Sequence, residues 1–285
     1  MRILVLGISG MLGSAVFKVF SLSTHEVFGT VRSATAKKYF KPELASKILT
    51  DVDVLNTEQL EKTIAEVRPD VVINCVGLVK QLADAKDPLI ALPINSMLPH
   101  HLARICKPLK ARVVHISTDC VFDGTKGNYL ESEFSDADDL YGRSKFLGEL
   151  TEESHTITLR TSIIGHELNT SKSLVDWFLS QKGSVKGYRR AIFSGVPTVE
   201  MADIILNYVI PNPYLMGLYH VSADPINKYE LLKLVNEVYG QKTEIIPDDS
   251  LVIDRSLNSE RFQKATGYKA AAWPHLIKKM FASKE

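Results

Sequence analysis

Residues 2–13 read Arg-Ile-Leu-Val-Leu-Gly-Ile-Ser-Gly-Met-Leu-Gly and decide how the chain folds. The apolar run at residues 3–6 is typical of a central parallel strand that is covered on both faces. Three glycines follow with the spacing G-x-x-G-x-x-G, and residues 14–20 continue as a helix. Glycines at these places permit a tight turn and let a pyrophosphate approach the backbone at the helix N-terminus. The segment predicts a dinucleotide-binding turn, the alternative being a tight turn that binds nothing; the candidate contacts are Gly7, Ser9, Gly10, Met11, Leu12 and Gly13.

Strand and helix patterns alternate from the first residue to residue 160. Apolar, strand-like segments lie at residues 26–31, 47–50, 70–75, 111–117 and 156–160, and helical patterns at 56–67 and 90–105. Because strands that alternate with helices form parallel sheets, this order predicts an α/β fold with a doubly wound parallel sheet.

The pattern loosens beyond residue 160. Helices are expected at residues 173–181, 200–210 and 228–239, short strands at 217–221 and 244–246, and a ligand-covering loop at 185–198. We therefore expect a main dinucleotide-binding domain of residues 1–165 plus 191–222. A small substrate-binding lobe of residues 166–190 plus 223–285 is expected to close over the edge of the sheet.

The composition of the 285 residues excludes several classes of function. Apolar residues make up 45% and charged residues 24%, and the formal net charge is +1, so no footprint for a nucleic-acid polymer is indicated. No apolar run approaches the ~20 residues that a membrane helix needs, and the short apolar start is interpreted as a strand rather than a signal peptide. Cys75, Cys106 and Cys120 are too few and too scattered for a disulfide framework or a metal site. A cytoplasmic protein is expected.

The strand ends suggest which dinucleotide binds. Arg32 follows the second strand, where an acid would bind a free ribose hydroxyl and an arginine a 2′-phosphate, so NADP is favoured over NAD. A surface arginine with no such role is the alternative. Asp53 and Val54 follow the third strand and are candidates for the adenine side. Residues 75–77, Cys-Val-Gly, end the fourth strand, where the glycine lets the cofactor approach the backbone.

Tyr141 and Lys145 form the candidate chemical pair. Residues four apart lie on one face of a helix, and an ammonium beside a phenol favours the phenolate. The lysine is also placed to hold a nucleotide ribose. A solvent-exposed helix face is the alternative interpretation of this short pattern. Residues 117–124 end the fifth strand, at the sheet edge where ligands bind in open α/β folds, and contain Thr118.

These motifs together resemble the extended short-chain dehydrogenase/reductase family, which implies a Rossmann fold. The resemblance rests on the three glycines, residues 74–77, Asn95, residues 117–119, and the tyrosine and lysine. Residues 117–124 and 141–149 look most like dTDP-4-dehydrorhamnose reductases, and residues 254–257 and 273–274 also fit that branch. The resemblance implies that NADPH (or NADH) is the cofactor, that Asn95 contributes to its site, and that a homodimer is possible.

The resemblance also implies roles for three side chains. Tyr141 would be the general acid that protonates the C4 oxygen of a nucleotide-linked 4-keto sugar as hydride arrives. Lys145 would lower the pKa of Tyr141 and bind the nicotinamide ribose, and Thr118 would donate a hydrogen bond to the developing alkoxide. Two relatives of other function stay open: a non-catalytic subunit like the regulatory subunit of methionine adenosyltransferase, and an epimerase that retains its nicotinamide.

The sugar pocket departs from that branch. Cys120 stands where dehydratases carry a glutamate base and rhamnose-type reductases usually a tyrosine, so elimination is disfavoured; its thiol is either packed or catalytic. Ile163 replaces an aromatic residue, and Val79 a threonine. These differences suggest another 4-keto-6-deoxy hexose, such as an N-acetylated sugar on UDP. The candidate substrate contacts, for which loop residues facing water are the alternative, are Lys80, Gln81, Asp119, Cys120, Ile163 and Arg189.

Overall fold

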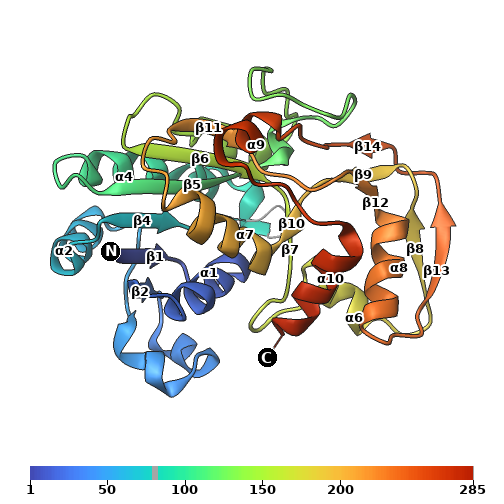
Figure 1. The fold of residues 1–285 in the computed structure, drawn as a ribbon, viewed down its shortest axis with the longest axis horizontal. Helices are drawn as coiled ribbons and strands as arrows, with labels where there is room; N and C mark the ends of the chain where they lie inside the picture. Colours follow the sequence, from blue (N-terminus) through green and yellow to red (C-terminus); the bar gives the residue numbers. More distant parts are fainter. Residues whose placement is uncertain (79–82, 285) are drawn as a thin grey trace.

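A seven-stranded parallel sheet forms the centre of the computed structural model, which describes residues 1–78 and 83–284 (Figure 1). In spatial order its strands are β11 (Gly217–His220), β6 (Thr156–Thr161), β5 (Arg112–Thr118), β4 (Val71–Asn74), β1 (Arg2–Leu6), β2 (Glu26–Thr30) and β3 (Ile48–Leu49). Every neighbouring pair is parallel. The order reverses between β1 and β4, which is the switch point where doubly wound sheets bind dinucleotides. The predicted fold class is confirmed.

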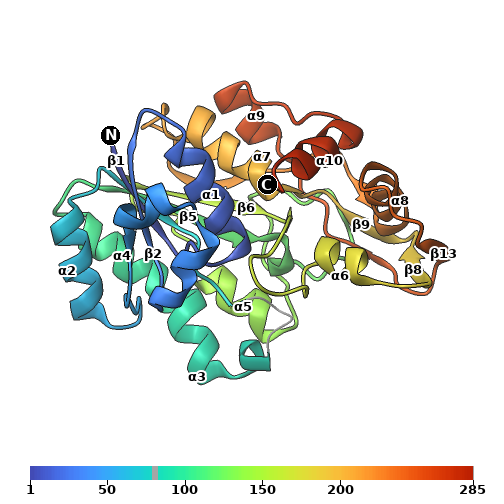
Figure 2. The same cartoon turned by 90° about the horizontal axis from the view of Figure 1, so that it is seen from below.

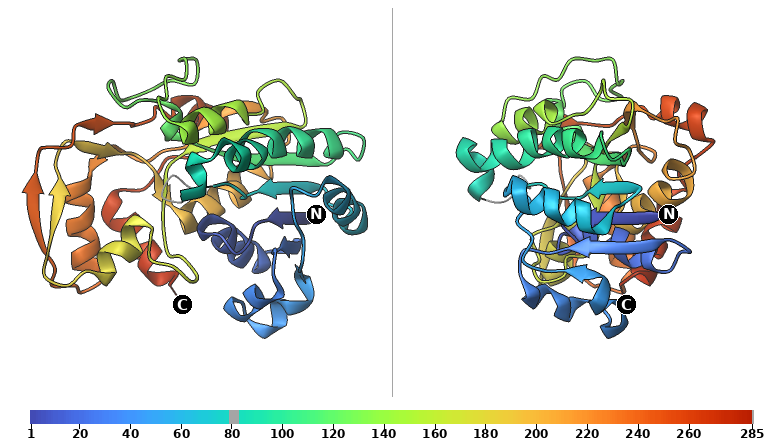
Figure 3. Two further views of the ribbon diagram at one scale, coloured as in Figure 1. Left: turned by 180° about the vertical axis from the view of Figure 1, so that it is seen from behind. Right: turned by 90° about the vertical axis from the view of Figure 1, so that its left-hand side faces the viewer.

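Both faces of the sheet are covered because successive side chains of a strand point to opposite sides. In β1, Ile3 and Val5 belong to one buried cluster, and Leu4 and Leu6 to another. The first cluster includes α1 (Met11–Ser21) and α7 (Thr198–Ile204), and the second α2 (Thr57–Val67) and α4 (Leu98–Cys106). These helix layers are seen from below in Figure 2 and from behind and the side in Figure 3.

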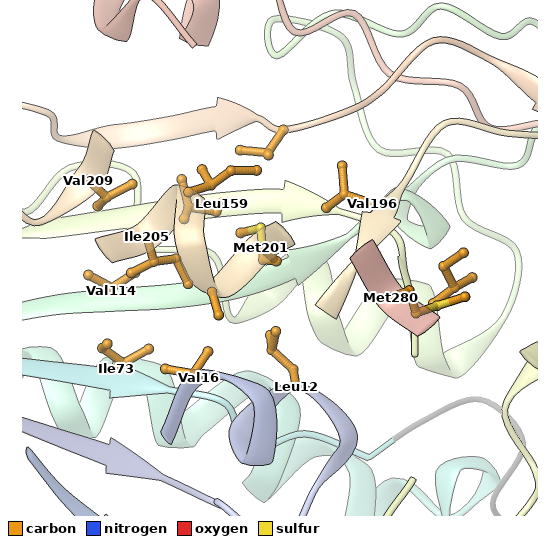
Figure 4. Close-up of a cluster of buried hydrophobic side chains, with 14 of the residues drawn as sticks. Leu12, Val16, Ile73, Val114, Leu159, Val196, Met201, Ile205, Val209 and Met280 are labelled. Carbon is orange, nitrogen blue, oxygen red and sulfur yellow. The ribbon is translucent and has the colours of Figure 1, made fainter. Parts of the chain in front are cut away.

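The larger cluster joins the two halves of the chain. Leu12 and Val16 of α1 lie below Met201 and Ile205 in Figure 4, with strand side chains between and beside them. Met280 of α10 (Trp273–Ala282) extends the same cluster. Since these side chains are all 6% exposed or less, the C-terminal helices are part of the core.

The helix expected at residues 90–105 is interrupted. It consists of α3 (Pro88–Ala91), a π-helical turn (Leu92–Met97) and α4. Pro93 lies inside the π-helical turn. Because proline has no N–H and its ring clashes with the preceding turn, an α-helical bond cannot form there.

The segment at residues 185–198 is not a loop, contrary to the expectation. It contains β8 (Ser184–Tyr188), β9 (Ala191–Phe193) and β10 (Val196–Pro197). Their partners are respectively β13 (Glu244–Asp248), the pair β12 (Ile226–Asn227) and β14 (Ile253–Asp254), and β7 (Ile163–Ile164). Every partner is more than 30 residues away, so local sequence could not reveal the pairing.

Beside the carboxyl ends of the sheet strands lie β8, β13 and α8 (Lys228–Val238), with α6 (Leu174–Ser180) below them (Figure 1). α9 (Glu260–Thr266) lies against β11, where Phe262 and Tyr219 pack edge to face at 6.0 Å. Within the described residues, we find no helix of the length and apolarity that spanning a membrane requires.

Candidate active site

The glycine turn has a geometry that only glycine tolerates. Gly7 has φ +78°, and a Cβ there would lie 2.8 Å from a methyl carbon of Val76. A Cβ on Gly13 would lie 2.2 Å from the Gly7 carbonyl oxygen. Thr30 stabilises the turn by accepting a hydrogen bond from the Gly7 N–H at 3.2 Å. Gly10 caps α1 without a side-chain oxygen, so the helix N-terminus is not blocked by its own cap.

The end of β4 lies directly beside this turn. The Asn74 side chain accepts a hydrogen bond from the Val76 N–H at 3.1 Å, and the Cys75 N–H extends the pairing with β1. The amide of Asn74 also contacts Nδ1 of His115 at 3.2 Å. Burial holds the pKa of His115 well below its usual range, and its ring is fully buried. His115 is therefore a neutral histidine packed in the core.

Asn95 joins the β4 loop to the helix that carries the tyrosine. Its side-chain oxygen accepts a hydrogen bond from the Leu78 N–H at 2.9 Å, and its side-chain nitrogen donates to the Ser144 hydroxyl at 3.1 Å. A Cβ on Gly77 would lie 3.6 Å from Oδ1 of Asn95 and 3.9 Å from Nζ of Lys145. The expected cofactor-binding loop and the expected catalytic lysine are therefore neighbours.

Thr118, Tyr141 and Lys145 converge at the carboxyl end of β5. Thr118 is the last residue of that strand, and the other two lie on α5 (Leu140–Leu147). Asp139 caps the N-terminus of α5: its side chain accepts a hydrogen bond from the Gly142 N–H at 2.7 Å. The Lys145 ammonium donates to the Ile116 carbonyl at 2.7 Å, while the Thr118 hydroxyl lies close to the Tyr141 phenol and donates its proton to Asp119 at 3.1 Å. Three groups far apart in sequence thus meet at one strand end.

Burial controls the protonation of this site. It raises the pKa of Tyr141 well above its usual range; the Cys120 charge adds to this and the Thr118 hydrogen bond opposes it. The lowering of this pKa that we expected from Lys145 is not found. Burial also lowers the pKa of Lys145 to about 8, against the opposing charges of Glu149 and Cys75. The phenol therefore carries its proton at neutral pH, as a group that is to donate one must.

A buried ion pair lies next to the end of α5. Glu149 receives hydrogen bonds from Arg160 Nε and Nη2, both at 2.6 Å, and from the Ser117 hydroxyl at 2.7 Å. Both charged side chains are 2% exposed. Glu149 lies just beyond the end of α5, and its negative charge acts on the Lys145 ammonium. His220 contacts the free side of the guanidinium at 3.3 Å.

Fewer contacts define the site that we expect to bind the adenosine half of the dinucleotide. Arg32 is exposed after β2 and is placed where the 2′-phosphate contact was predicted. The Asp53 carboxylate accepts a hydrogen bond from the Leu55 N–H at 3.0 Å, and Val54 packs into the apolar cluster beneath α2. The roles of these three residues stay predictions.

The predicted sugar contacts are dispersed. Asp119 and Cys120 continue from Thr118 into a short helical turn, and burial raises the pKa of Asp119, opposed by the Arg255 charge. Ile163 is half-buried in β7. Arg189 forms an exposed ion pair with Asp249 at the end of the β8–β13 pair. Two further predicted contacts lie outside the described residues, namely Lys80 and Gln81.

Two cations from the C-terminal half were not predicted as site residues. Arg255 donates from Nε to the Phe122 carbonyl at 2.7 Å, and its Nη1 lies 3.9 Å from the sulfur of Cys120. Lys228 begins α8, and its charge interacts with those of Asp119 and Cys120. Little in the sequence indicated that Lys228 belongs to the site. The chain has many lysines, and this one simply follows Asn227, which caps α8. Among the described residues, no group of three or more histidine, cysteine or acidic side chains is placed to hold a metal.

Curated proteins of several functions are similar to this chain. It is 34% identical over 146 residues to a probable low-salt glycan biosynthesis reductase, Agl14, of Haloferax volcanii, a match covering 51% of this chain and 46% of that protein. It is 28% identical to methionine adenosyltransferase 2 subunit beta of Rattus norvegicus, over 98% of this chain and 89% of that protein. It is 24% identical to the dTDP-4-dehydrorhamnose reductase of Aggregatibacter actinomycetemcomitans, over 100% and 99% of the two chains.

Solved structures show the same fold. A hypothetical dTDP-4-dehydrorhamnose reductase from Sulfolobus tokodaii aligns with TM-score 0.77 and 27% identity, over 96% of this chain and 98% of that one. The Bacillus anthracis dTDP-4-dehydrorhamnose reductase in complex with NADP aligns with TM-score 0.81 and 20% identity, over 100% and 99%. The sequence model of the RmlD substrate binding domain matches residues 1–284. The chain belongs to the RmlD substrate binding domain family, within the extended short-chain dehydrogenases/reductases that its motifs resemble.

Proposed function

We propose that this chain is an NADPH-dependent reductase of a nucleotide-diphosphate-linked 4-keto-6-deoxy hexose. The observation that carries the proposal is that the Thr118 hydroxyl, the Tyr141 phenol and the Lys145 ammonium lie at the end of β5, with Lys145 beside Gly77 of the β4 loop. Hydrogen-bond and proton donors that meet near a dinucleotide-binding turn are suited to the reduction of a carbonyl group. Family membership, the reductases among the relatives and the fold shared with an NADP complex all support it.

The residues fit a bound dinucleotide. A Cβ at Gly7 or Gly13 would collide with Val76 or with backbone, so the strand, the helix and the β4 loop approach one another through bare backbone, as dinucleotide-binding turns require. The residues that would hold the dinucleotide are those of the glycine turn, the β4 loop and Lys145, with Arg32 toward a 2′-phosphate. The dinucleotide supplies a hydride when bound.

The side chains supply the proton and the charge. Tyr141, protonated at neutral pH, gives its phenolic proton to the carbonyl oxygen as the carbon becomes an alcohol carbon. The Thr118 hydroxyl, which donates to Asp119 at 3.1 Å here, turns to donate to that oxygen. Lys145 holds a positive charge close to the reacting oxygen. No base that removes a carbon-bound proton is required.

The sugar is proposed to differ from 4-dehydrorhamnose. Cys120 and Ile163 occupy places where the rhamnose-type reductases carry aromatic side chains; each follows by two residues a member of the Thr118–Thr161 pair, where β5 and β6 end. Smaller side chains leave room for a larger substituent. An N-acetylated 4-keto sugar on UDP is our leading candidate.

The test is the loss of reduced-nicotinamide absorbance with a panel of dTDP- and UDP-linked 4-keto sugars. Tyr141→Phe should lower kcat by at least ~100-fold, the lower end of what a positioned general acid contributes, with NADPH affinity retained. Tyr214→Phe is the matched control, because Tyr214 is 91% exposed. Turnover by Tyr141→Phe at the wild-type rate would reject the assignment.

A regulatory subunit is the second candidate. It is favoured by the 28% identity to methionine adenosyltransferase 2 subunit beta over nearly the whole chain. A protein that binds NADPH but oxidises it with no sugar of the panel, and that changes the activity of a methionine adenosyltransferase, would support it. An epimerase would instead keep its nicotinamide through purification.

A further inference from the structure

A three-stranded sheet of the C-terminal half places two cations on either side of one strand. β9 is the middle strand, and Ile192 in it pairs with both Asn227 of β12 and Asp254 of β14. The next residue along each outer strand is Lys228 or Arg255. β12 runs antiparallel to β9, whereas β14 runs parallel to it. The chain therefore continues from the two strands in opposite directions along β9, with Lys228 as the next residue on one side and Arg255 on the other.

Arg255 fixes this small sheet to the strand end that carries Thr118. Its Nε donates to the Phe122 carbonyl at 2.7 Å, and its Nη1 lies 3.9 Å from the Cys120 sulfur. A Cβ on Gly124 would lie 3.0 Å from the Arg255 side chain. Contacts this close leave little freedom between the two parts, so Lys228 is held in a fixed relation to the catalytic strand end.

Lys228 lies over Phe193, in the middle strand of the same small sheet, and forms no ion pair among the described residues. Its ammonium lies 4.3 Å from the centre of the Phe193 ring, and the charges of Asp119 and Cys120 act on it. Within residues 1–78 and 83–284, no carboxylate lies within 4 Å of this ammonium. Lys233, on the same helix, differs: it is paired with Glu230 at 3.2 Å and is half exposed.

We propose that Lys228 is a specificity-determining residue, whose ammonium donates a hydrogen bond to an oxygen of the hexose part of the substrate. The proposal rests on the proposed function. The reacting carbonyl must lie between Thr118 and Tyr141, and Asp119 directly follows Thr118. Because Arg255 fixes the small sheet to this strand end, the Lys228 ammonium of the same sheet is directed toward the hexose rather than the nucleotide. A lysine ammonium carries three donors and no acceptor, so its partner is a hydroxyl or acyl oxygen.

The test compares nucleotide sugars with bare nucleotides, by calorimetry in the presence of NADP⁺. The probes are UDP-N-acetylglucosamine and dTDP-glucose, each against UDP or dTDP. Lys228→Met keeps the length of the side chain and removes its donors. It should weaken the binding of the nucleotide sugar about 10- to 100-fold, as expected for one charged hydrogen bond, and leave the bare nucleotide unchanged. Lys233→Met should change neither.

Each outcome decides between explanations. Equal weakening of sugar-linked and bare nucleotides would overturn the proposal, because Lys228 would then bind the diphosphate. Unchanged binding of both would overturn it as well, provided that the variant unfolds at the wild-type temperature. If the wild-type protein binds no nucleotide sugar at all, the proposed function itself fails, and this inference with it. Loss of NADP⁺ binding in Lys228→Met would indicate a structural role and also count against the proposal.

Discussion

The buried ion pair of Glu149 and Arg160 predicts a large loss of stability when the Glu149 carboxylate is replaced by an amide of the same shape. Glu149→Gln keeps the shape of the side chain but removes its charge. The carboxylate now accepts two bonds from the guanidinium at 2.6 Å and one from Ser117 at 2.7 Å. Since both charged side chains are 2% exposed, Arg160 would stay buried without a counter-charge. Breaking a buried pair in this way costs about 3–5 kcal/mol.

This cost converts to a melting temperature through the unfolding entropy. An entropy of about 2.1 cal/mol/K per residue, applied to 285 residues, amounts to roughly 0.6 kcal/mol/K for the whole chain. The expected fall in Tm is therefore about 5–8 °C. Thermal unfolding at pH 7, followed by circular dichroism and repeated with urea, measures it. Reversibility should be checked first, because an irreversible transition reports a rate instead.

Glu153→Gln is the matched control for this substitution. Glu153 pairs with Lys107 at a similar distance, 2.9 Å, but the two side chains are 43% and 65% exposed. Exposed pairs contribute about 0–1 kcal/mol, so its Tm should change little. Equal losses in the two variants would refute the reasoning from burial. Adding Arg160→Met to Glu149→Gln should recover part of the loss, since it removes the stranded charge.

Two further predictions concern single cations. Arg32→Ala should weaken NADPH at least about tenfold more than NADH, because only NADPH carries the 2′-phosphate; fluorescence titration measures both, and equal losses would remove Arg32 from the site. Lys145→Met tests the pKa of about 8 in the folded protein, compared with 10.5 when unperturbed. The folded wild type binds fewer protons than the unfolded chain between these values, so its stability relative to Lys145→Met should rise by about 3 kcal/mol from pH 7 to pH 10.5. A difference that stays flat in urea unfolding across this range would contradict the buried-lysine interpretation.

The first 21 residues show why the main sheet was predictable. An apolar strand, a glycine turn and an amphipathic helix are local patterns, and each agrees with the final packing. Tyr141 and Lys145 were found because helical spacing is also local. The position of Lys145 beside Gly77 follows from the parallel sheet, whose strands end at a common edge.

Long-range pairing was beyond the reach of pattern analysis. The segment 185–198 was expected to be a loop, yet β8 pairs with β13 some 60 residues later. Short strands carry few residues from which a period can be recognised, and their partners decide their conformation. Lys228 and Arg255 were missed for the same reason, because only the register of β12 and β14 with β9 brings them to the site.

The pKa of Tyr141 also depends on information that the sequence pattern lacks. The spacing of Tyr141 and Lys145 suggested a lowered value, but burial of the phenol dominates. Spacing reports which groups are neighbours, whereas desolvation depends on everything packed around them.

A short stretch of β5 and its continuation unites the functions of the chain. Ile116 holds the Lys145 ammonium, Ser117 the Glu149 carboxylate, and Thr118 the Tyr141 phenol. Four residues later, Phe122 holds Arg255 of the C-terminal half. The proposed proton donor, the proposed positive charge and the segment that we expect to face the substrate are therefore all held by successive residues of one strand end. A shift of that strand end would disturb reduction and sugar recognition together, whereas a change confined to β9 and its neighbours would alter recognition alone.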